Sequence, residues 1–241
     1  MTPIANKADL EKVVGDVQRR WGPKALHKGV SEILDAARSI PTGFQALDHP
    51  IGGGLPRGHV VEFTGAPTSG IHTLALHAVA ALQTRGETAA YLDLGGTFDP
   101  EYAARCGVVV PELLLLRPKN LVEGLEMSLD LVTYGAGILV WDSDASLLAT
   151  RDGDKLLSRA LQHLRTLLAG SQSLVVFLAP GNRHAGNGSP TLGHHAALSL
   201  HLQTTRWLRD RRAITGYEVQ ARLLRNRGGP TGGRVTFSIH L

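Results

Sequence analysis

A stretch that begins at Gly65 has the spacing of a phosphate-binding loop. A second glycine, Gly70, follows after four intervening residues, and a β-forming run precedes the first. Glycines at this spacing let backbone N–H groups surround an anion, and the start of the following helix adds positive potential. A loop that acts on a nucleoside triphosphate continues with Lys, which neutralises the phosphates, and with Ser or Thr, which holds Mg²⁺. This chain has Ile71 and His72 at those two positions, followed by Thr73, so the sequence predicts the loop without its two chemical groups.

These two replacements determine whether the loop is expected to bind or hydrolyse ATP. Phosphoryl transfer depends on positioning and on charge neutralisation, and removing one preorganised stabiliser typically costs on the order of 10²–10³ in rate. We therefore predict no ATP hydrolysis, no catalytic residue and no cofactor. The side chain of Ile71 is expected to lie against the place of the phosphate oxygens. Two alternatives remain for the loop: weak nucleotide binding through backbone N–H groups, or a turn kept only for the fold.

Length and composition indicate one α/β domain with a short appendage. The chain has 241 residues, of which 43% are hydrophobic, and a mean hydropathy of −0.02. It has no apolar run of about 18 residues that could span a membrane, and its first residues do not form the apolar segment of a signal peptide. The single cysteine, Cys106, excludes an internal disulfide, fits a reducing compartment and is expected in the core. We expect a cytoplasmic protein without a membrane partner.

Positive charge is concentrated in the last third of the chain. The net charge is +4, and residues 206–234 contain eight Arg against one Asp and one Glu. Such a stretch favours an anionic partner, with nucleic acid as the first candidate. Arg206 and Arg209 are therefore candidate DNA contacts. A basic face that only maintains solubility or pairs with acidic groups of a neighbouring subunit is the alternative.

Strand and helix patterns alternate from residue 59 onward, which is typical of a parallel sheet covered by helices on both faces. The last three expected strands have Gly-rich turns and indicate an antiparallel edge. The expected strands are 59–64, 88–94, 137–141, 173–178, 197–203, 217–224 and 234–239, and the expected helices are 71–85, 100–105 and 155–168.

The first 39 residues contain an apolar stripe at helical spacing, which ends at a Gly-Pro pair. We expect residues 1–39 to be a helical segment for oligomerisation or docking, and residues 40–241 to be the core domain. The alternative is that this helix folds back on its own domain. The stripe consists of Leu10, Val13, Val14, Val17 and Trp21.

Residues 180–195 are rich in Gly, Asn, Pro, Ser and His and show no periodicity, so a loop is expected there. Its small residues suit a close approach of single-stranded DNA, with basic side chains on the phosphates; disorder is the alternative. The spacing of its histidines fits no metal-ligand pattern, so no metal site is expected. The candidate DNA contacts of the loop are Arg183, His184, His194 and His195.

Three segments of the chain resemble the ATPase core of the bacterial RecA recombinases. They are residues 40–58, which lead into the loop, residues 93–108, and residues 139–143. The resemblance implies a RecA-type P-loop NTPase core with a mainly parallel sheet, flanking helices, an antiparallel C-terminal edge and an N-terminal helical extension. By the same resemblance, Tyr102 would stack on adenine and Asp142 would be the carboxylate of the Walker B strand.

The resemblance also shows what this chain lacks. The family's water-orienting Glu falls on Gly95, and its phosphate-sensing Gln falls on Pro180. Arg225 and Arg227 stand where the family has two Lys that reach a neighbour's nucleotide, and the N-terminal helix matches the segment that docks onto the next subunit.

The resemblance therefore implies an inactive RecA paralogue that assists DNA repair or recombination in the response to DNA damage, as in the SOS response. The RecA-like ImuA accessory proteins of damage-induced mutagenesis are the nearest analogy. The expected partners of this chain are single-stranded DNA, an active recombinase or repair polymerase complex, and further copies of itself. The alternatives are a divergent DNA-dependent ATPase and a protein-interaction module without DNA affinity.

Overall fold

The computed structural model describes residues 12–16, 19–20, 22, 39–142, 151–180, 190–210 and 213–240. The chain divides into two units, Met1–Ile33 and Leu34–Leu241. In the first unit, residues 12–16 and 19–20 are helical, with Val13 exposed and Val14 half-buried. Leu10, Val17 and Trp21 of the predicted stripe lie outside the described residues, so the docking role of this segment stays a prediction.

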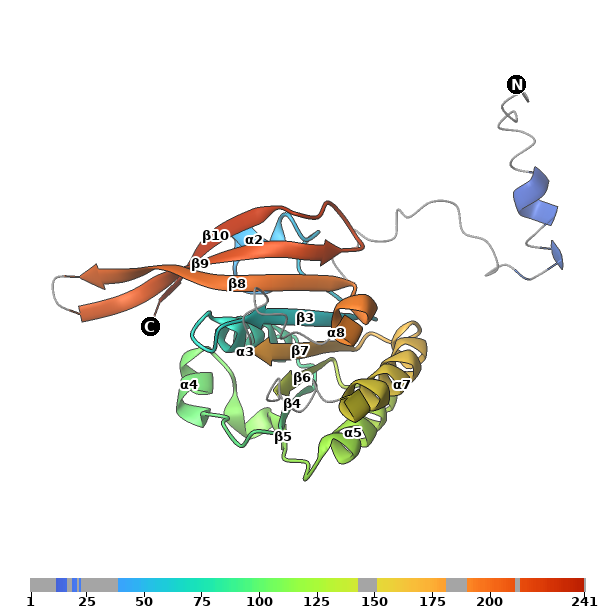
Figure 1. Cartoon of the computed structure of the whole chain (residues 1–241), viewed down its shortest axis with the longest axis horizontal. Coiled ribbons are helices and arrows are strands. Elements are labelled where there is room, and N and C mark those ends of the chain that lie inside the picture. Colours follow the sequence, from blue (N-terminus) through green and yellow to red (C-terminus); the bar gives the residue numbers. More distant parts are fainter. Residues whose placement is uncertain are drawn as a thin grey trace, which may run out of the picture. The chain divides into compact units, whose positions relative to one another are not determined.

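The second unit is built on an eight-stranded sheet in the order β10-β9-β8-β3-β7-β6-β4-β5 (Figure 1). The six strands from β8 to β5 run parallel, β9 pairs antiparallel with β8, and β10 pairs antiparallel with β9. Two short strands, β1 and β2, pair separately. The strands are β1 (Ser39–Ile40), β2 (Leu55–Pro56), β3 (Val60–Gly65), β4 (Ala89–Asp93), β5 (Leu114–Leu116), β6 (Ile138–Asp142), β7 (Leu174–Pro180), β8 (Leu198–Asp210), β9 (Ala213–Asn226) and β10 (Arg234–His240).

Both faces of the parallel part are buried, because alternate residues of each strand point to opposite sides. Val140 packs in a cluster with α3, while its neighbour Trp141 packs in a second cluster with α5 and α7. The indole N–H of Trp141 donates to Ser128 Oγ at 2.6 Å, which fixes α5 over this face. The helices are α2 (Gln45–Asp48), α3 (Ile71–Gln83), α4 (Pro100–Arg105), a 3₁₀ turn (Val110–Glu112), α5 (Leu121–Thr133), α7 (Arg151–Leu168) and α8 (Pro190–His195).

Local sequence explains where helices begin. Asp99 caps α4 by accepting from the N–H groups of Glu101 and Tyr102 at 2.9 and 3.0 Å. Asn120 caps α5 through the N–H of Glu123 at 3.0 Å, and the carboxylate of Glu123 accepts in return from a backbone N–H just before the cap. These caps hold the loops that follow the carboxyl ends of the strands, where the candidate site lies.

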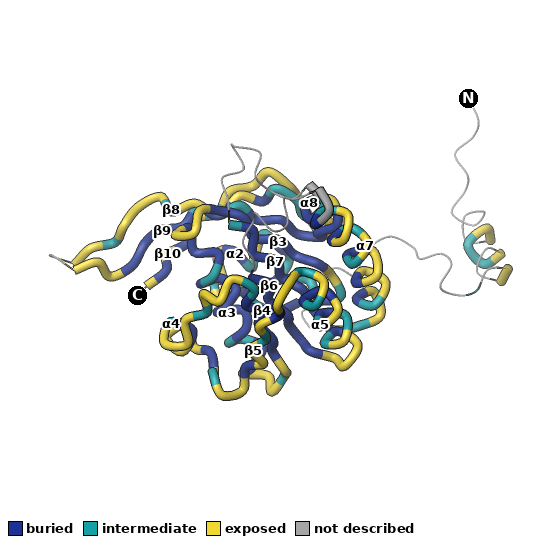
Figure 2. The backbone as a smooth tube through the Cα atoms, turned by 60° about the horizontal axis from the view of Figure 1, so that its bottom comes forward, coloured by how far each residue is buried: buried dark blue, intermediate teal, exposed yellow. Residues whose placement is uncertain are grey.

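The predicted α/β fold with a mainly parallel sheet and an antiparallel edge is confirmed. The expectation of a loop through residues 190–195 is wrong, because these residues form the short helix α8; residues 181–189 lie outside the described residues. Strands β8 and β9 are longer than predicted and form a hairpin that extends beyond the rest of the sheet (Figure 1). Figure 2 shows buried central strands and an exposed end of this hairpin.

None of the helices in the described ranges is long and apolar enough to cross a membrane.

Candidate functional site

The loop between β3 and α3 needs glycine at both ends of the motif. A Cβ on Gly65 would lie 2.4 Å from the carbonyl oxygen of Leu202 and 2.3 Å from Ser69 Oγ, which is too close for any side chain. Gly70 precedes α3 with a φ of 92°, a left-handed conformation that favours glycine. The hydroxyl of Thr204 on β8 also donates to the carbonyl of Thr68 at 2.9 Å. Packing against β8 therefore fixes the shape of the loop.

The side chain of Ile71 belongs to the core and not to the surface of the loop. It is 0% exposed and packs in the cluster between α3 and the sheet. The expectation that it lies against the place of phosphate oxygens is therefore wrong. An apolar side chain at this position is more stable when buried, and the start of α3 directs it inward. This position consequently stabilises the fold and offers no charge to the loop.

His72 lies beside the carboxylate that ends β6. Its Nε2 is 3.3 Å from Asp142 Oδ1, and the hydroxyl of Tyr91 donates to Asp142 Oδ2 at 2.7 Å. Burial alone would raise the pKa of Asp142, but the hydrogen bond and charge of His72 and the Tyr91 hydroxyl lower it below its ordinary value. Burial and the nearby Asp142 raise the pKa of Tyr91, so this phenol stays a donor. Each oxygen of the carboxylate thus already has a hydrogen-bonding partner.

We predict that Asp142 and His72 stabilise the fold jointly. In a double-mutant cycle, Asp142→Asn and His72→Ala should be non-additive by about 1 kcal/mol near neutral pH, because either change removes the same contact. Because the pKa of Asp142 is lowered in the folded protein, its carboxylate stabilises the fold at pH values above the unfolded pKa of 3.8. This stabilisation is lost as the pH falls through the folded pKa. Lowering the pH from about 5 to 3 should therefore reduce the free energy of unfolding more in the wild type than in Asp142→Asn, as measured by urea denaturation. The matched control is Asp130→Asn on exposed α5 surface; additive effects at Asp142 and His72 would contradict this pairing.

Three hydroxyl groups meet near the start of α3. Thr73 Oγ1 lies 2.6 Å from the Tyr102 hydroxyl and 3.1 Å from the Tyr217 hydroxyl. Burial is the main cause that raises the pKa of Tyr102. The guanidinium of Arg105 lies 5.4 Å from the centre of the Tyr102 ring. Tyr102 is therefore fixed to α3 from the start of α4.

A pocket of about 410 Å³ lies at the carboxyl ends of β4 and β6, and the side chains of His72, Thr73 and Tyr102 line it. The structure brings together five of the predicted loop residues there, Gly70, His72, Thr73, Tyr102 and Asp142. The walls are largely apolar and aromatic, and no group of three or more potential metal ligands occurs among the described residues. The pocket also includes Pro67, Thr68, Leu76, Tyr91, Thr97, Phe98, Asp99, Trp207 and Tyr217.

The predicted DNA contacts separate into two places. Arg206 and Arg209 lie on β8 in the hairpin, and both Arg206 guanidinium nitrogens that face Glu218 donate to its carboxylate, at 2.9 and 3.0 Å. His194 and His195 lie at the end of α8, where His195 is 8% exposed. Arg183 and His184 lie outside the described residues.

The predicted interface arginines contact α8. Arg225 Nη1 donates to the carbonyl of Gly193 at 2.7 Å, and Arg227 Nη2 donates to that of His194 at 3.4 Å. These contacts place Arg225, near the end of β9, and Arg227, just after it, beside the helix and not in the loop pocket.

Sequence reasoning missed several residues that shape these sites. Tyr91 and Tyr217 supply hydroxyls to the loop pocket, and Trp207 supplies an exposed ring 5.5 Å from that of Tyr217. Tyr91 lies on the strand that pairs with β6, so its approach to Asp142 depends on sheet order, which is not visible locally. An aromatic residue within the basic stretch was the available signal for Trp207.

Comparisons with known proteins agree with this architecture. A model of the RecA N-terminal domain family matches residues 8–240. Protein RecA of Rhodospirillum centenum is 33% identical over 262 residues, which cover 99% of this chain and 73% of the relative. Protein RecA of Acidiphilium cryptum is 34% identical and covers 97% of this chain and 75% of the relative. Protein RecA of Lactobacillus delbrueckii subsp. bulgaricus is 31% identical, with 95% and 76% covered.

The match extends over nearly the whole chain, and the eight-stranded sheet places the glycine loop, Tyr102 and Asp142 around one pocket. The chain belongs to the RecA family.

Proposed function

We propose that this protein is an accessory factor of DNA recombination or repair that binds single-stranded DNA and a recombinase or polymerase partner without hydrolysing ATP. The observation that carries the proposal is what the side chains at loop positions 71 and 72 contact. Ile71 is buried in the core, and His72 contacts Asp142. A working loop would use these positions for the phosphates and for Mg²⁺. The side chains present do neither.

The residues at the metal position do not fit Mg²⁺. Mg²⁺ takes oxygen ligands in octahedral geometry, whereas His72 offers an imidazole nitrogen. Both oxygens of Asp142 already have partners in His72 and Tyr91. Gly95, at the place of the water-orienting carboxylate, offers no side chain at all. The residues at these positions therefore do not support a hydrolytic step.

Weak nucleotide binding is compatible with the proposal. The first turn of α3 presents backbone N–H groups and positive potential near Gly70, and the ring of Tyr102 lines the same pocket. Without Lys and Mg²⁺, the charge of a triphosphate would be poorly compensated there. Nucleotide would thus be an occasional ligand and not a substrate.

We predict that Ile71→Lys combined with His72→Thr does not create ATPase activity. The double variant regains the motif residues, but Gly95 still supplies no carboxylate to orient water. Phosphate release with Mg-ATP and single-stranded DNA should stay at background, provided that circular dichroism shows a folded protein. Wild-type protein assayed in parallel serves as the control.

Turnover by the wild type would favour the divergent ATPase. Turnover by the double variant alone would contradict this prediction, because it would show that a carboxylate at position 95 is not required. Gly95→Glu can be added to the double variant, because position 95 has room for a side chain: a Cβ there would meet only Thr97 atoms, at 3.7 Å.

The hairpin of β8 and β9 supports the DNA-binding part of the proposal. It carries Arg209 and a 47% exposed Trp207 on β8. Basic side chains beside an exposed aromatic ring suit single strands, because cations contact the phosphates while bases stack on the ring. Glu218 neutralises Arg206 locally, so Arg209 and Trp207 are the stronger candidates.

An edge strand supports the protein-binding part of the proposal. β5 ends the sheet, and it exposes Leu114 and Leu115, which are 44% and 39% accessible. Val109 just before it is 45% exposed. Exposed apolar residues on a sheet edge mark a site for another chain. The apolar stripe around Val13 and Val14, from another copy or from a related recombinase, has matching chemistry.

We predict that Val13→Asp combined with Val14→Asp weakens self-association or recombinase binding at least tenfold, because each substitution replaces apolar contact by a charge. Leu114→Asp should have the same effect from the other side of the interface. Light scattering and recombinase pull-down would measure both. Lys12→Asp, next to the stripe, controls for charge alone. A strictly monomeric wild type that also fails to bind recombinase would contradict the docking role.

A further inference from the structure

We propose that the loop pocket binds a small organic cation, which carries an ammonium or amidinium group on a flat apolar body. This ligand class has the opposite charge to a nucleoside triphosphate, and it goes beyond the proposed binding of DNA and of protein partners. The volume of about 410 Å³ is ample for one aromatic ring with a charged group.

The charges around the loop pocket favour a cation. Its described lining contains two carboxylates, Asp99 and Asp142, and neither Lys nor Arg. Burial alone would raise the pKa of Asp142, but His72 and Tyr91 keep it below its ordinary value, so this carboxylate is charged at neutral pH. A helix start is equivalent to at most about half a positive charge, so the two carboxylates outweigh the starts of α3 and α4.

Asp99 is the carboxylate that has a free oxygen. It caps α4 through Oδ1, which accepts from both backbone N–H groups, at 2.9 and 3.0 Å. Its Oδ2 has no hydrogen-bonding partner among the described residues. An amidinium or ammonium group donates hydrogen bonds to such an oxygen.

Aromatic rings form much of the pocket wall. The ring of Trp207 lies 5.5 Å from that of Tyr217. The ring of Tyr91 lies 4.9 Å from that of Phe98. Tyr102 is held by its hydroxyl, which lies 2.6 Å from a hydroxyl in the first turn of α3. The faces of aromatic rings attract cations, and walls that are already held in place lose little entropy when a ligand binds.

The Tyr102 ring already has one contact with a cation. The guanidinium carbon of Arg105 lies 5.4 Å from the centre of this ring, within the range of a cation–π interaction. Arg105 lines a separate small cavity and is not part of the described lining of the loop pocket. The chain thus uses a ring of this pocket for the kind of contact that the proposed ligand would make.

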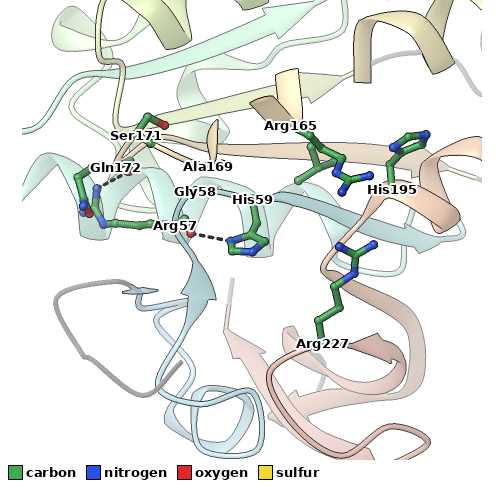
Figure 3. Close-up of a pocket in the computed structure, with 11 residues that line it drawn as sticks. Arg57, Gly58, His59, Arg165, Ala169, Ser171, Gln172, His195 and Arg227 are labelled. Atoms are coloured by element: carbon green, nitrogen blue, oxygen red, sulfur yellow. Dashed lines mark hydrogen bonds between the residues drawn. The ribbon is translucent and has the colours of Figure 1, made fainter. Parts of the chain in front are cut away.

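Figure 3 shows a contrasting pocket at the other end of β3, where Arg57, Arg165 and Arg227 contribute to the walls. No Asp or Glu occurs among the described residues that line it. β3 runs from Val60 at that pocket to Gly65 at the glycine loop, so the arginines and the carboxylates lie toward opposite ends of one strand. A small cation is therefore repelled at one end of β3 and attracted at the other.

Three ligands of one shape test the role of charge in the full chain. Benzamidine is a cation, benzamide is neutral and benzoate is an anion, and all three have the same ring. Calorimetry should show saturable binding of benzamidine, about tenfold tighter than that of benzamide, because an ion contact and a cation–π contact are added. Benzoate should show no saturable binding. This comparison uses the wild type and needs no variant.

Nuclear magnetic resonance locates the ligand. In protein with ¹⁵N-labelled tryptophan, benzamidine should shift the indole signal of Trp207, which is assigned by its loss in Trp207→Phe. The indole of Trp141, which is buried and donates to Ser128, should not shift. A shift of neither signal on saturation with benzamidine would place the ligand elsewhere and overturn the proposal.

Two substitutions separate charge from fold. Asp99→Asn should weaken benzamidine binding about two- to fivefold and leave benzamide binding unchanged, because Asn caps a helix as well as Asp does. Glu101→Gln, in the first turn of the same helix but outside the described lining, is the matched control and should bind benzamidine as the wild type does. Trp207→Leu should weaken benzamidine binding by a similar two- to fivefold, about the value of one exposed cation–π contact.

Equal affinities for benzamidine and benzamide would overturn the proposal, as would equal effects of Asp99→Asn and Glu101→Gln. Adenosine tests a neutral nucleoside as the alternative ligand. If adenosine binds more tightly than benzamidine and shifts the same Trp207 signal, the pocket takes a neutral ring and the proposed cation site is wrong. None of these outcomes depends on whether the protein binds DNA or hydrolyses ATP.

Discussion

Ile71→Ala is expected to lower the free energy of unfolding by about 2–4 kcal/mol, as truncation of fully buried aliphatic side chains does. The side chain is 0% exposed and packs between α3 and the sheet. Its removal loses apolar burial and leaves a cavity at the start of α3. In a loop that acts on phosphates, the residue at this position serves chemistry; here we expect it to serve stability.

Urea or thermal denaturation would measure this loss. Val122→Ala is the matched control, because Val122 lies on α5 and is 45% exposed. It should change stability by less than about 0.5 kcal/mol. A small effect of Ile71→Ala on stability, together with a changed affinity for ATP, would show that this residue faces the loop and not the core.

Trp207→Ala is expected to reduce the affinity for single-stranded DNA by roughly tenfold to a hundredfold. Stacking of one base on an aromatic ring is worth about 1–3 kcal/mol by alanine substitution, and about 1.4 kcal/mol corresponds to one decade. Trp207 is 47% exposed on the hairpin. Fluorescence anisotropy with a labelled oligonucleotide at low salt measures the effect.

Two neighbouring arginines provide an internal comparison. Arg209→Ala should weaken binding more than Arg206→Ala, because Arg206 is already engaged by Glu218. Binding by the wild type should also fall steeply with salt, since phosphate contacts release counterions. Equal affinity of the Trp207 variant and the wild type would remove the hairpin from the DNA-binding surface. No binding at micromolar protein would favour an interaction module without DNA affinity.

Much of the fold could be predicted from the sequence because its signals are local. The cap at Asp99 and the β-rich runs around Val60 and Ile138 mark elements that the structure contains. α5 was not predicted, in part because Gly124 weakens helix propensity in its interior. The structure explains this glycine, since a Cβ there would lie 2.9 Å from the ring of Trp141.

The length of the hairpin could not be predicted because its strands are irregular. The pairing of β8 with β9 shifts between Thr204 and Arg206, and again between Leu208 and Arg209. Each shift breaks the alternation of inward and outward residues on which strand prediction depends. Helix α8 was not predicted either, because its residues, Pro190–His195, are compositionally like a loop and are ordered by tertiary contacts.

In the candidate sites, too, residues with a local sequence signal could be predicted, whereas contacts between distant segments could not. Gly65, Gly70 and His72 could be identified from spacing alone. The contact of Tyr91 with Asp142 follows from the pairing of β4 with β6, and the meeting of Arg165 with Arg227 joins residues that are far apart in the chain. Such contacts depend on sheet order and helix packing, which no local pattern specifies.

The central claim is that this chain binds single-stranded DNA without using ATP. One measurement tests it most directly: phosphate release and oligonucleotide anisotropy recorded in the same sample, with Mg-ATP added after the DNA. We predict saturable DNA binding at low salt, phosphate release at background, and no change in DNA affinity when Mg-ATP is added. Phosphate release stimulated by DNA, or DNA affinity that requires Mg-ATP, would contradict the account.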